Sequence, residues 1–326
     1  MSDKIMNDDG MAYRLSEGHP WHGKGVGLPD DATLDDYRAA ANLNWEIQTA
    51  PLFYQRVGPT ETVNVPVNRR VMFRADTLNA LDVIGSEYVP AQPSEVLEFF
   101  RDYLGSGDMT MTTCGSLSGG RYVWGQANLK EGFTLAGGDE VRGKLLIANP
   151  NRYGHGLIAK LVLERVVCWN TLTMALSESG RKIILAHNRK FDEPARRDAM
   201  TKFGLAAAGF ANIKKEATTF AQTRITDDAA VTKVLAGAFK VPLTEKGELL
   251  RDSRQVNRCR DLFDGVGDGA GLASAAGTAW GLLNAVTQYV DHEMGRGDAN
   301  DRLAFSWFGS GDGIKNRARK ALWQLT

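Results

Sequence analysis

The sequence predicts an α+β protein in which antiparallel β-hairpins form a sheet packed with helices, followed by a helical C-terminal part. Apolar, β-branched runs separated by turn residues dominate residues 1–190, and this pattern is typical of hairpins. Residues 191–326 instead carry apolar side chains at three- to four-residue spacing, which indicates amphipathic helices. Strands and helices do not alternate regularly, so the pattern does not favour a parallel βαβ sheet.

The composition is that of a globular protein: 326 residues, 43% hydrophobic and 24% charged. No run of about 18 apolar residues occurs, and the polar N-terminus lacks the apolar stretch of a signal peptide. The three cysteines, Cys114, Cys168 and Cys259, are far apart and form no CxxC pair. Such sparse cysteines are typical of reduced thiols and favour a cytoplasmic location without membrane association.

Residues 1–33 are predicted to form an extended N-terminal arm, because glycines and prolines interrupt them and no periodicity is present. His19 and His22 have the spacing of an HxxH metal-binding pair, but no third or fourth ligand lies nearby. We therefore favour the alternative that Trp21 anchors the arm to the body of the protein.

An α+β sheet core is expected over residues 34–190. Thr33 precedes acidic residues and alanines, which is a helix-start pattern. Prolines and short polar turns separate the apolar runs that follow. The predicted elements are a helix at 33–42, a strand at 45–57, a hairpin of 70–74 with 80–88, a helix from Ser94, hairpins over 109–129 and 144–167, and a short strand at 183–186.

A mainly helical region over residues 191–326 is expected to pack on the core. Its predicted elements are helices over 194–210, 231–239, 280–294 and 314–325, a hinge at 251–271, and a glycine-rich turn at 309–313. The sequence GVGDGAGL at 265–272 could bind a phosphate at a helix N-terminus. It does not match GxGxxG in register, and no GxxxxGK[ST] motif occurs, so we favour a flexible connection.

Residues 160–176 combine an apolar run with a polar turn. The run predicts a buried strand, and the polar groups of Asn170 and Thr171 are placed to cap a helix that follows. Arg165 lies within the apolar run, where an unpaired charge is costly. It therefore needs an anion, either an internal carboxylate or a phosphate, and we interpret the stretch as the floor of a basic groove.

Catalytic candidates are few. Cys168 could act as a nucleophile with His155 or His187 as its base, but a thiol that follows apolar strand residues is more often inert core. Asp291 and His292 begin an Asp-His-Glu run suited to acid/base chemistry, yet consecutive helical residues point in different directions. An enzyme that uses His187, Asp291 and His292 is the weakest hypothesis, and we expect a non-enzyme without metal or cofactor.

Charge is unevenly distributed along the neutral chain. Residues 1–140 contain 11 Lys and Arg against 20 Asp and Glu, a net charge of −9. Residues 141–260 contain 22 against 11, a net charge of +11, and residues 261–326 contain 6 against 8, a net charge of −2. The basic block is typical of a nucleic-acid surface. The alternative is that acidic and basic faces neutralise each other within one fold or between subunits.

The basic block supplies our candidate nucleic-acid contacts, which are cations for phosphates together with aromatic faces for bases. The candidate residues are Lys160, Arg165, Trp169, Arg181, Lys182, Arg189, Lys190, Arg196, Arg197, Lys214 and Lys215. Tyr153 and Phe191 are additional aromatics nearby, and Tyr153 or Trp169 could stack on bases. The alternative is that these charges form an ordinary solvated face.

Five segments carry a family resemblance: MAYR…PWHGKG, GSLSGGRYVWGQANL, LERVVCWNTL, TAWGLLNAVTQYVDH and FGSGDGIKNRA. They resemble the phage/plasmid-like proteins that are labelled domain of unknown function 932. The resemblance extends from about Met11 to Leu325, and Asn170, Thr171 and Leu172 match the family's continuation after RVVC. Membership implies a phage, prophage or plasmid origin and supplies neither an activity nor catalytic residues.

The hairpin–helix–hairpin order is similar in kind to the core of the eukaryotic strand-annealing recombination mediators, which form rings that hold a single strand in a basic groove. That likeness is one of fold, because no annealing motif is matched. Our first hypothesis is a homo-oligomeric ring or filament that binds single-stranded DNA and promotes annealing in recombination. The alternative is a structural protein that self-assembles by pairing acidic and basic regions of neighbouring subunits and binds no nucleic acid.

Overall fold

The structure is a computed structural model that describes most of the 326 residues of the chain. The described residues are 10–18, 25–101, 104, 107, 109–167, 170–173, 183–185, 187, 193–194, 197, 201, 210–295 and 299–326. Trp21, His19 and His22 lie outside them, as do Cys168, Phe191 and most of the predicted helix at 194–210.

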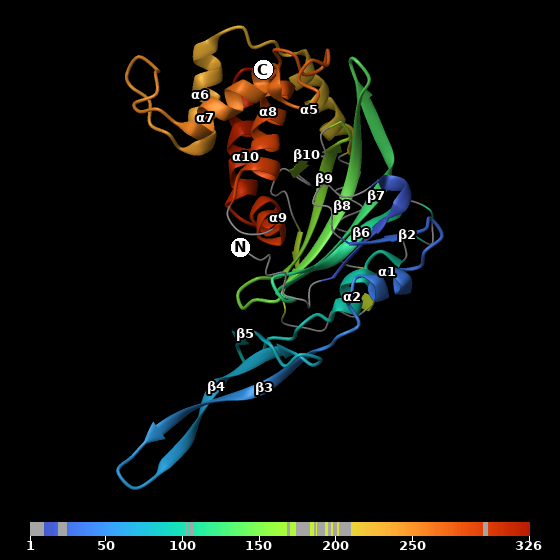
Figure 1. Cartoon of the computed structure of the whole chain (residues 1–326), viewed down its shortest axis with the longest axis vertical. Coiled ribbons are helices and arrows are strands. Elements are labelled where there is room, and N and C mark those ends of the chain that lie inside the picture. The colour runs from blue at the N-terminus through green and yellow to red at the C-terminus, as the bar shows by residue number, and fades with distance from the viewer. Residues whose placement is uncertain are drawn as a thin grey trace. The chain divides into compact units, whose positions relative to one another are not determined.

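The α+β prediction is confirmed, because two sheets precede a helical C-terminal part (Figure 1). Within the described residues the larger sheet has the strand order β10-β9-β8-β7-β6-β1-β2, and β11 also pairs with β9. Its strands are β1 (Met11–Arg14), β2 (Val26–Leu28), β6 (Met109–Leu117), β7 (Tyr122–Leu135), β8 (Asp139–Pro150), β9 (Leu157–Arg165), β10 (Asn170–Thr173) and β11 (Ile183–Leu185). The smaller sheet is β3 (Ile47–Val57), β4 (Thr62–Arg74) and β5 (Ala80–Ile84).

The chain divides into two compact units that do not follow the predicted boundaries at residues 33 and 190. Unit 1 contains Met1–Asn128, Leu145–Lys160 and Lys182–Leu205. Unit 2 contains Leu129–Lys144, Leu161–Arg181 and Ala206–Thr326. The chain passes from one unit to the other within β7, β8 and β9.

Two segments of the predicted arm are strands of the larger sheet and not loop. β1 pairs antiparallel with β6 and parallel with β2. A 3-10 turn, η1 (Leu15–Glu17), follows β1. The four residues of β1 are too few to show an alternating pattern, and their pairing partner lies about a hundred residues later in the chain. Local sequence therefore predicted a loop where a distant strand imposes pairing.

The β3–β4 pair is a long two-stranded ribbon in unit 1, visible as the blue strands of Figure 1. Strand β5 pairs only with the end of β4 that carries Arg70 to Phe73. At that end the guanidinium of Arg74 is buried, lies 4.4 Å from the Trp45 ring centroid and donates to the Asp76 carboxylate. The predicted pairing of 70–74 with the strand that begins at Ala80 is confirmed, but that strand ends at Ile84 and not at residue 88.

Two short helices of unit 1 begin with capping boxes, which satisfy backbone amides that the helix leaves free. Helix α1 (Leu34–Ala40) is capped by Thr33, whose hydroxyl accepts from the Asp36 amide while the Asp36 carboxylate accepts from the Thr33 amide. Helix α2 (Pro93–Glu98) is capped in the same way by Gln92 and Glu95. Both predicted helices are confirmed.

Unit 2 is dominated by helices. They are α5 (Phe210–Gln222), α6 (Asp228–Phe239), α7 (Arg254–Asp261), the π-turn η2 (Leu262–Val266), α8 (Ala279–Gln288), the π-turn η3 (Tyr289–Glu293), α9 (Ala299–Phe308) and α10 (Ser310–Leu322). Helix α8 is buried along nearly its whole length and packs against α5, α10 and β10. No helix among the described residues is long and apolar enough to cross a bilayer.

Three local predictions in unit 2 are corrected. Residues 170–173 form β10, which pairs antiparallel with β9, and not the first turn of a helix. Pairing with a neighbouring strand has overridden the capping pattern there. The predicted hinge contains helix α7, capped by Ser253. The glycine-rich segment at 309–313 lies mostly in the first turn of α10, where Gly309 and Gly311 pack against Phe305.

Candidate functional site

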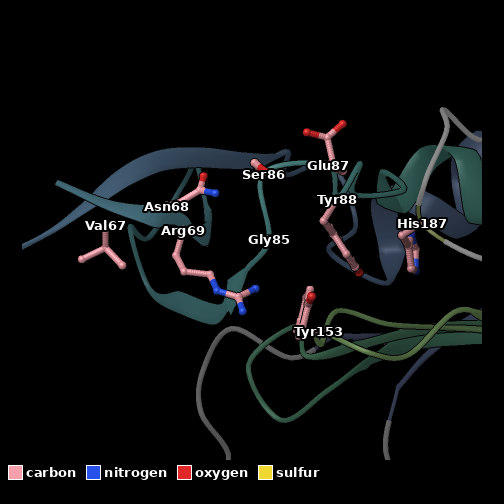
Figure 2. Close-up of a pocket in the computed structure, with 9 residues that line it drawn as sticks. All are labelled: Val67, Asn68, Arg69, Gly85, Ser86, Glu87, Tyr88, Tyr153 and His187. Carbon is pink, nitrogen blue, oxygen red and sulfur yellow. The ribbon is translucent and has the colours of Figure 1, made fainter.

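A pocket of about 630 Å³ lies in unit 1, a size typical of sites for small molecules. Three separate parts of the chain line it: β4, the loop after β5, and the turn between β8 and β9, together with the isolated described residue 187 (Figure 2). The lining residues are Val67, Asn68, Arg69, Gly85, Ser86, Glu87, Tyr88, Tyr153 and His187.

A cation and aromatic rings meet in this pocket. The Arg69 guanidinium carbon lies 5.0 Å from the Tyr153 ring centroid, and the Tyr88 and Tyr153 centroids are 6.5 Å apart. Figure 2 shows the Arg69 side chain extending from the ribbon toward Tyr153. Tyr153 is half exposed, whereas Tyr88 is buried. Tyr153 therefore presents ring surface at the pocket mouth, with a positive charge beside it.

Strand geometry explains why Arg69 is available. The register of β3 with β4 shifts between Pro51, opposite Arg70, and Leu52, opposite Val67, so Arg69 lies in a bulge of β4. The Arg70 guanidinium donates to the Thr49 hydroxyl at 3.2 Å, to the Ser86 carbonyl at 2.9 Å and to the Tyr88 carbonyl at 2.6 Å. Arg70 thus fixes the loop that carries Tyr88, while the Arg69 side chain is exposed.

Tyr153 is held in place from the smaller sheet. Its backbone amide donates to the Asp82 carboxylate at 2.8 Å. Gly85 lies beneath the ring, where an added Cβ would come within 3.2 Å of the Tyr153 ring and 3.4 Å of the Arg69 guanidinium. The absence of a side chain at position 85 therefore permits the close approach of arginine and ring.

His187 forms the buried end of the pocket. Its Nδ1–H donates to the Val89 carbonyl at 3.2 Å, and the Val89 amide donates to the His187 carbonyl at 2.8 Å. Its ring centroid lies 4.7 Å from that of Tyr88. Burial lowers the pKa of His187, because desolvation disfavours the imidazolium. The imidazole is therefore neutral at pH 7, with its proton on Nδ1.

The charges that line the pocket are those of Arg69 and Glu87. Figure 2 shows the Glu87 carboxylate pointing away from Tyr153, whereas the Arg69 guanidinium points toward it. Tyr88 contributes a hydroxyl whose pKa is raised by burial. The interior of the pocket is therefore positive at one side, aromatic along its walls and uncharged at its buried end.

Six of the predicted nucleic-acid residues lie outside the described part of the chain: Trp169, Arg181, Lys182, Arg189, Lys190 and Arg196. Of the other five, Lys214 and Lys215 are exposed on α5 in unit 2. Arg197 is exposed in unit 1 and pairs with Glu193 four residues earlier. These three remain candidates for phosphate contacts.

Lys160 and Arg165 are interior residues, which corrects their assignment to an exposed groove. Both are 2% exposed. The anion that Arg165 requires is an internal carboxylate, because its Nε donates to Asp139 at 2.8 Å. Its other nitrogens donate to the Asp268 and Gly269 carbonyls at 3.1 and 2.9 Å. A guanidinium committed to these partners does not bind a phosphate at the surface.

Asp139 is the centre of this buried network in unit 2. Besides Arg165, it accepts from the Ser274 hydroxyl at 2.6 Å and from the Trp280 indole at 3.0 Å. Arg165 thus fastens the glycine-rich segment at 265–272 to strand β9. The sequence predicted that segment as a flexible connection, with a phosphate loop as the alternative. A second buried ion pair, Lys144 with Glu164 at 2.6 Å, lies on the adjoining strands.

The catalytic candidates are dispersed. Asp291 is buried and accepts from Lys315 Nζ at 2.8 Å, whereas Glu293 pairs with Arg258 at 2.7 Å. The Asp-His-Glu run therefore does not converge on one point. Cys114 and Cys259 are buried, and burial raises the pKa of both thiols. Among the described side chains, no cluster of three or more His, Cys, Asp or Glu is arranged to hold a metal ion.

From the sequence, Tyr153 was predicted to stack on bases and His187 to act as a catalytic base. Arg69 and Tyr88 were not predicted as site residues. The sequence signal for Arg69 was an Arg-Arg pair next to apolar strand residues, but the bulge that contains Arg69 depends on the pairing with β3. No comparable signal marks Tyr88, which follows a strand as an ordinary aromatic. Its role depends on a loop held by a distant arginine.

The fold and pocket define an α+β protein with a pocket that combines cationic and aromatic groups. A family model described as "Domain of unknown function (DUF932)" matches residues 80–319, and the chain belongs to that family. No curated protein and no solved structure matches the chain.

Proposed function

We propose that this protein binds single-stranded DNA and promotes strand annealing as a homo-oligomer, acting in the cytoplasm for phage or plasmid recombination. The observation that carries the proposal is the Arg69 guanidinium 5.0 Å from the Tyr153 ring, at the mouth of a nucleotide-sized pocket. Single-strand binding uses aromatic faces for stacking and cations for the backbone. Both are present at one point of unit 1.

Tyr153 is suited to stacking because half of its surface is free and its backbone is fixed by Asp82. Stacking of a base on an aromatic ring contributes about 1–3 kcal/mol by alanine substitution. Arg69 supplies a cation close to where the adjoining phosphate would lie. The exposed Lys214 and Lys215 of α5 add sequence-independent attraction that falls with salt.

The test is fluorescence anisotropy with a labelled single-stranded oligonucleotide, titrated at several salt concentrations. We expect Tyr153→Ala to weaken binding about tenfold or more, because the stacking face is lost. We expect Arg69→Gln to weaken it and to reduce the slope of log K against log salt by about 0.7, the effect of one lost phosphate contact.

Matched control residues lie on the β3–β4 ribbon, which also carries Arg69, but outside the pocket. Tyr54 is as exposed as Tyr153, and Arg56 is an exposed arginine like Arg69. Tyr54→Ala and Arg56→Gln should leave the affinity within about twofold. Failure of the wild-type protein to bind at low salt would refute the proposal, as would equal losses in the pocket variants and their controls.

Annealing is a separate property and needs its own assay. Two complementary oligonucleotides carrying a donor and an acceptor dye report duplex formation by energy transfer. We expect the wild-type protein to accelerate annealing and Tyr153→Ala to lose most of that acceleration. Binding without acceleration would limit the function to protection of the strand.

A self-assembling structural protein is the second candidate, favoured by the β3–β4 ribbon. Phe53, Tyr54 and Val57 are 52%, 54% and 78% exposed, and a two-stranded ribbon is marginally stable alone. A second copy of the chain would cover these side chains. Light scattering with and without DNA distinguishes the candidates: assembly that Val57→Asp abolishes, in a protein that binds no DNA, supports the structural role.

A further inference from the structure

Two polar atoms at the buried end of the pocket have no hydrogen-bond partner among the residues that the structure describes. They are the Tyr88 hydroxyl and Nε2 of His187. The two residues are 8% and 9% exposed, and both line the pocket. Buried polar groups are normally satisfied, and leaving one unsatisfied is costly. A pair left open at the end of a pocket therefore points to a ligand that completes it.

The hydrogen-bond roles of this pair are fixed by its surroundings. A carbonyl only accepts, so the 3.2 Å contact with Val89 places the imidazole proton on Nδ1. In the neutral ring the other nitrogen, Nε2, is then an acceptor. The Tyr88 hydroxyl can donate. The pair thus offers one acceptor and one donor in the same pocket, on rings whose centroids are 4.7 Å apart.

The space before this pair suits a flat ring. Tyr88 and Tyr153 have their centroids 6.5 Å apart, with planes inclined by 46°. Two stacked contacts need about 7 Å, so no ring fits between the two tyrosines. An incoming ring therefore stacks on the half-exposed Tyr153 and directs its edge toward Tyr88 and His187.

We propose that Tyr88 and His187 bind the Watson–Crick edge of one unpaired base, which stacks on Tyr153. This inference rests on the proposed single-strand binding and specifies what the pocket recognises. Each of the four bases carries an adjacent donor and acceptor on its pairing edge, so the pair accepts any base. A base within a duplex has that edge occupied and is excluded. Selectivity for single strands thus arises from capture of the pairing edge, as in enzymes that read an extruded base.

The consequence for annealing is that one base per protomer is withheld from pairing. The rest of the strand keeps its pairing edges free. A protein that held every base in this way would block annealing, whereas a single anchoring pocket does not.

The experiment compares two short single-stranded oligonucleotides, one of thymidine and one of N3-methylthymidine. They have the same phosphates and ring faces, but a methyl group replaces the N3–H that His187 Nε2 would accept. We expect the wild-type protein to bind the methylated strand about tenfold more weakly, because a buried acceptor is left unpaired. His187→Phe keeps the ring contact with Tyr88 and should bind both strands with equal affinity.

Tyr88→Phe is the second variant, to be used if circular dichroism shows that His187→Phe is poorly folded. It removes only the hydroxyl and should weaken binding of the thymidine strand several-fold. Equal wild-type affinity for both strands, with Tyr153→Ala still weakening both, would overturn the edge-capture inference and leave single-strand binding intact. Absence of binding to either strand would overturn both.

Discussion

The carboxylate of Asp82 accepts a hydrogen bond from the backbone amide of Tyr153 at 2.8 Å. The bond joins strand β5 of the smaller sheet to the turn after β8, two segments about seventy residues apart in the chain. It determines where the exposed ring of the pocket stands. Positioning of Tyr153 is therefore separable from the chemistry of its ring.

Replacing Asp82 tests that separation. We expect Asp82→Ala to weaken single-strand binding several-fold, since Tyr153 keeps its ring but loses its anchor. The free energy of unfolding should fall by about 0.5–1.5 kcal/mol, the usual contribution of one hydrogen bond. Anisotropy and urea denaturation measure the two effects. Unchanged affinity would show that the turn is held by other contacts.

Gly85 tests the close packing of Arg69 and Tyr153. The backbone of residue 85 needs no glycine conformation, so Gly85→Ala should change the stability little as long as the exposed Tyr153 ring can move. Its Cβ would displace the ring or the guanidinium by a few tenths of an ångström. We expect binding about threefold weaker at unchanged melting temperature. Gly237→Ala on α6, where the new Cβ meets no atom within 4 Å, is the control.

Breaking the buried Arg165–Asp139 pair is expected to destabilise the protein, because a buried charge loses its partner. Asp139→Asn leaves a buried guanidinium without its carboxylate, and this should cost about 3–5 kcal/mol in urea denaturation. Adding Arg165→Met to Asp139→Asn should restore more than half of the loss. The exposed pair of Arg142 with Glu140 is the control, because Glu140→Gln should change stability by at most about 1 kcal/mol.

The lowered pKa of His187 predicts that the stability of the protein depends on pH. Its pKa in the folded protein lies below the ordinary value of 6.5, so the unfolded chain binds the proton more readily. The free energy of unfolding should therefore decrease as the pH falls below about 6.5, until the folded-state pKa is reached. Urea denaturation at pH 8 and pH 5 measures the decrease. An equal decrease in His187→Phe would assign it to other groups.

The two buried cysteines are expected to be unreactive. Burial raises the pKa of Cys114 and Cys259, so little thiolate forms at pH 8. In a Cys168→Ser background, a thiol reagent should label no cysteine in the native protein and two after denaturation. Rapid labelling of either residue under native conditions would show that unit 1 or unit 2 opens readily at that point.

The fold was largely predictable because its hairpins and capped helices are marked locally. Thr33 followed by acidic residues predicts the start of α1. Ser118 and Gly119, both with positive φ, form the turn that marks the β6–β7 hairpin. Strands β1 and β10 were not predictable in this way. Each is four residues long and depends on a partner strand, β6 or β9, for its conformation.

The pocket could be predicted only in part. Tyr153 and His187 belong to residue types that invite functional hypotheses, but the sequence does not show that they share a pocket with Arg69. That arrangement depends on Arg70 holding one loop and Asp82 holding another. The charge pattern also could not reveal that Arg165 has an internal partner, since Asp139 is 26 residues distant in the chain.

The passage of the chain through β7, β8 and β9 from one unit to the other limits how the protein can be divided. Neither unit is encoded by a continuous stretch of sequence, so no truncation yields one of them intact. Fragments ending at residue 128 or beginning at residue 206 should fail to fold when produced separately. Insertions are therefore expected to be tolerated only in loops such as the tip of the β3–β4 ribbon, where they interrupt neither unit.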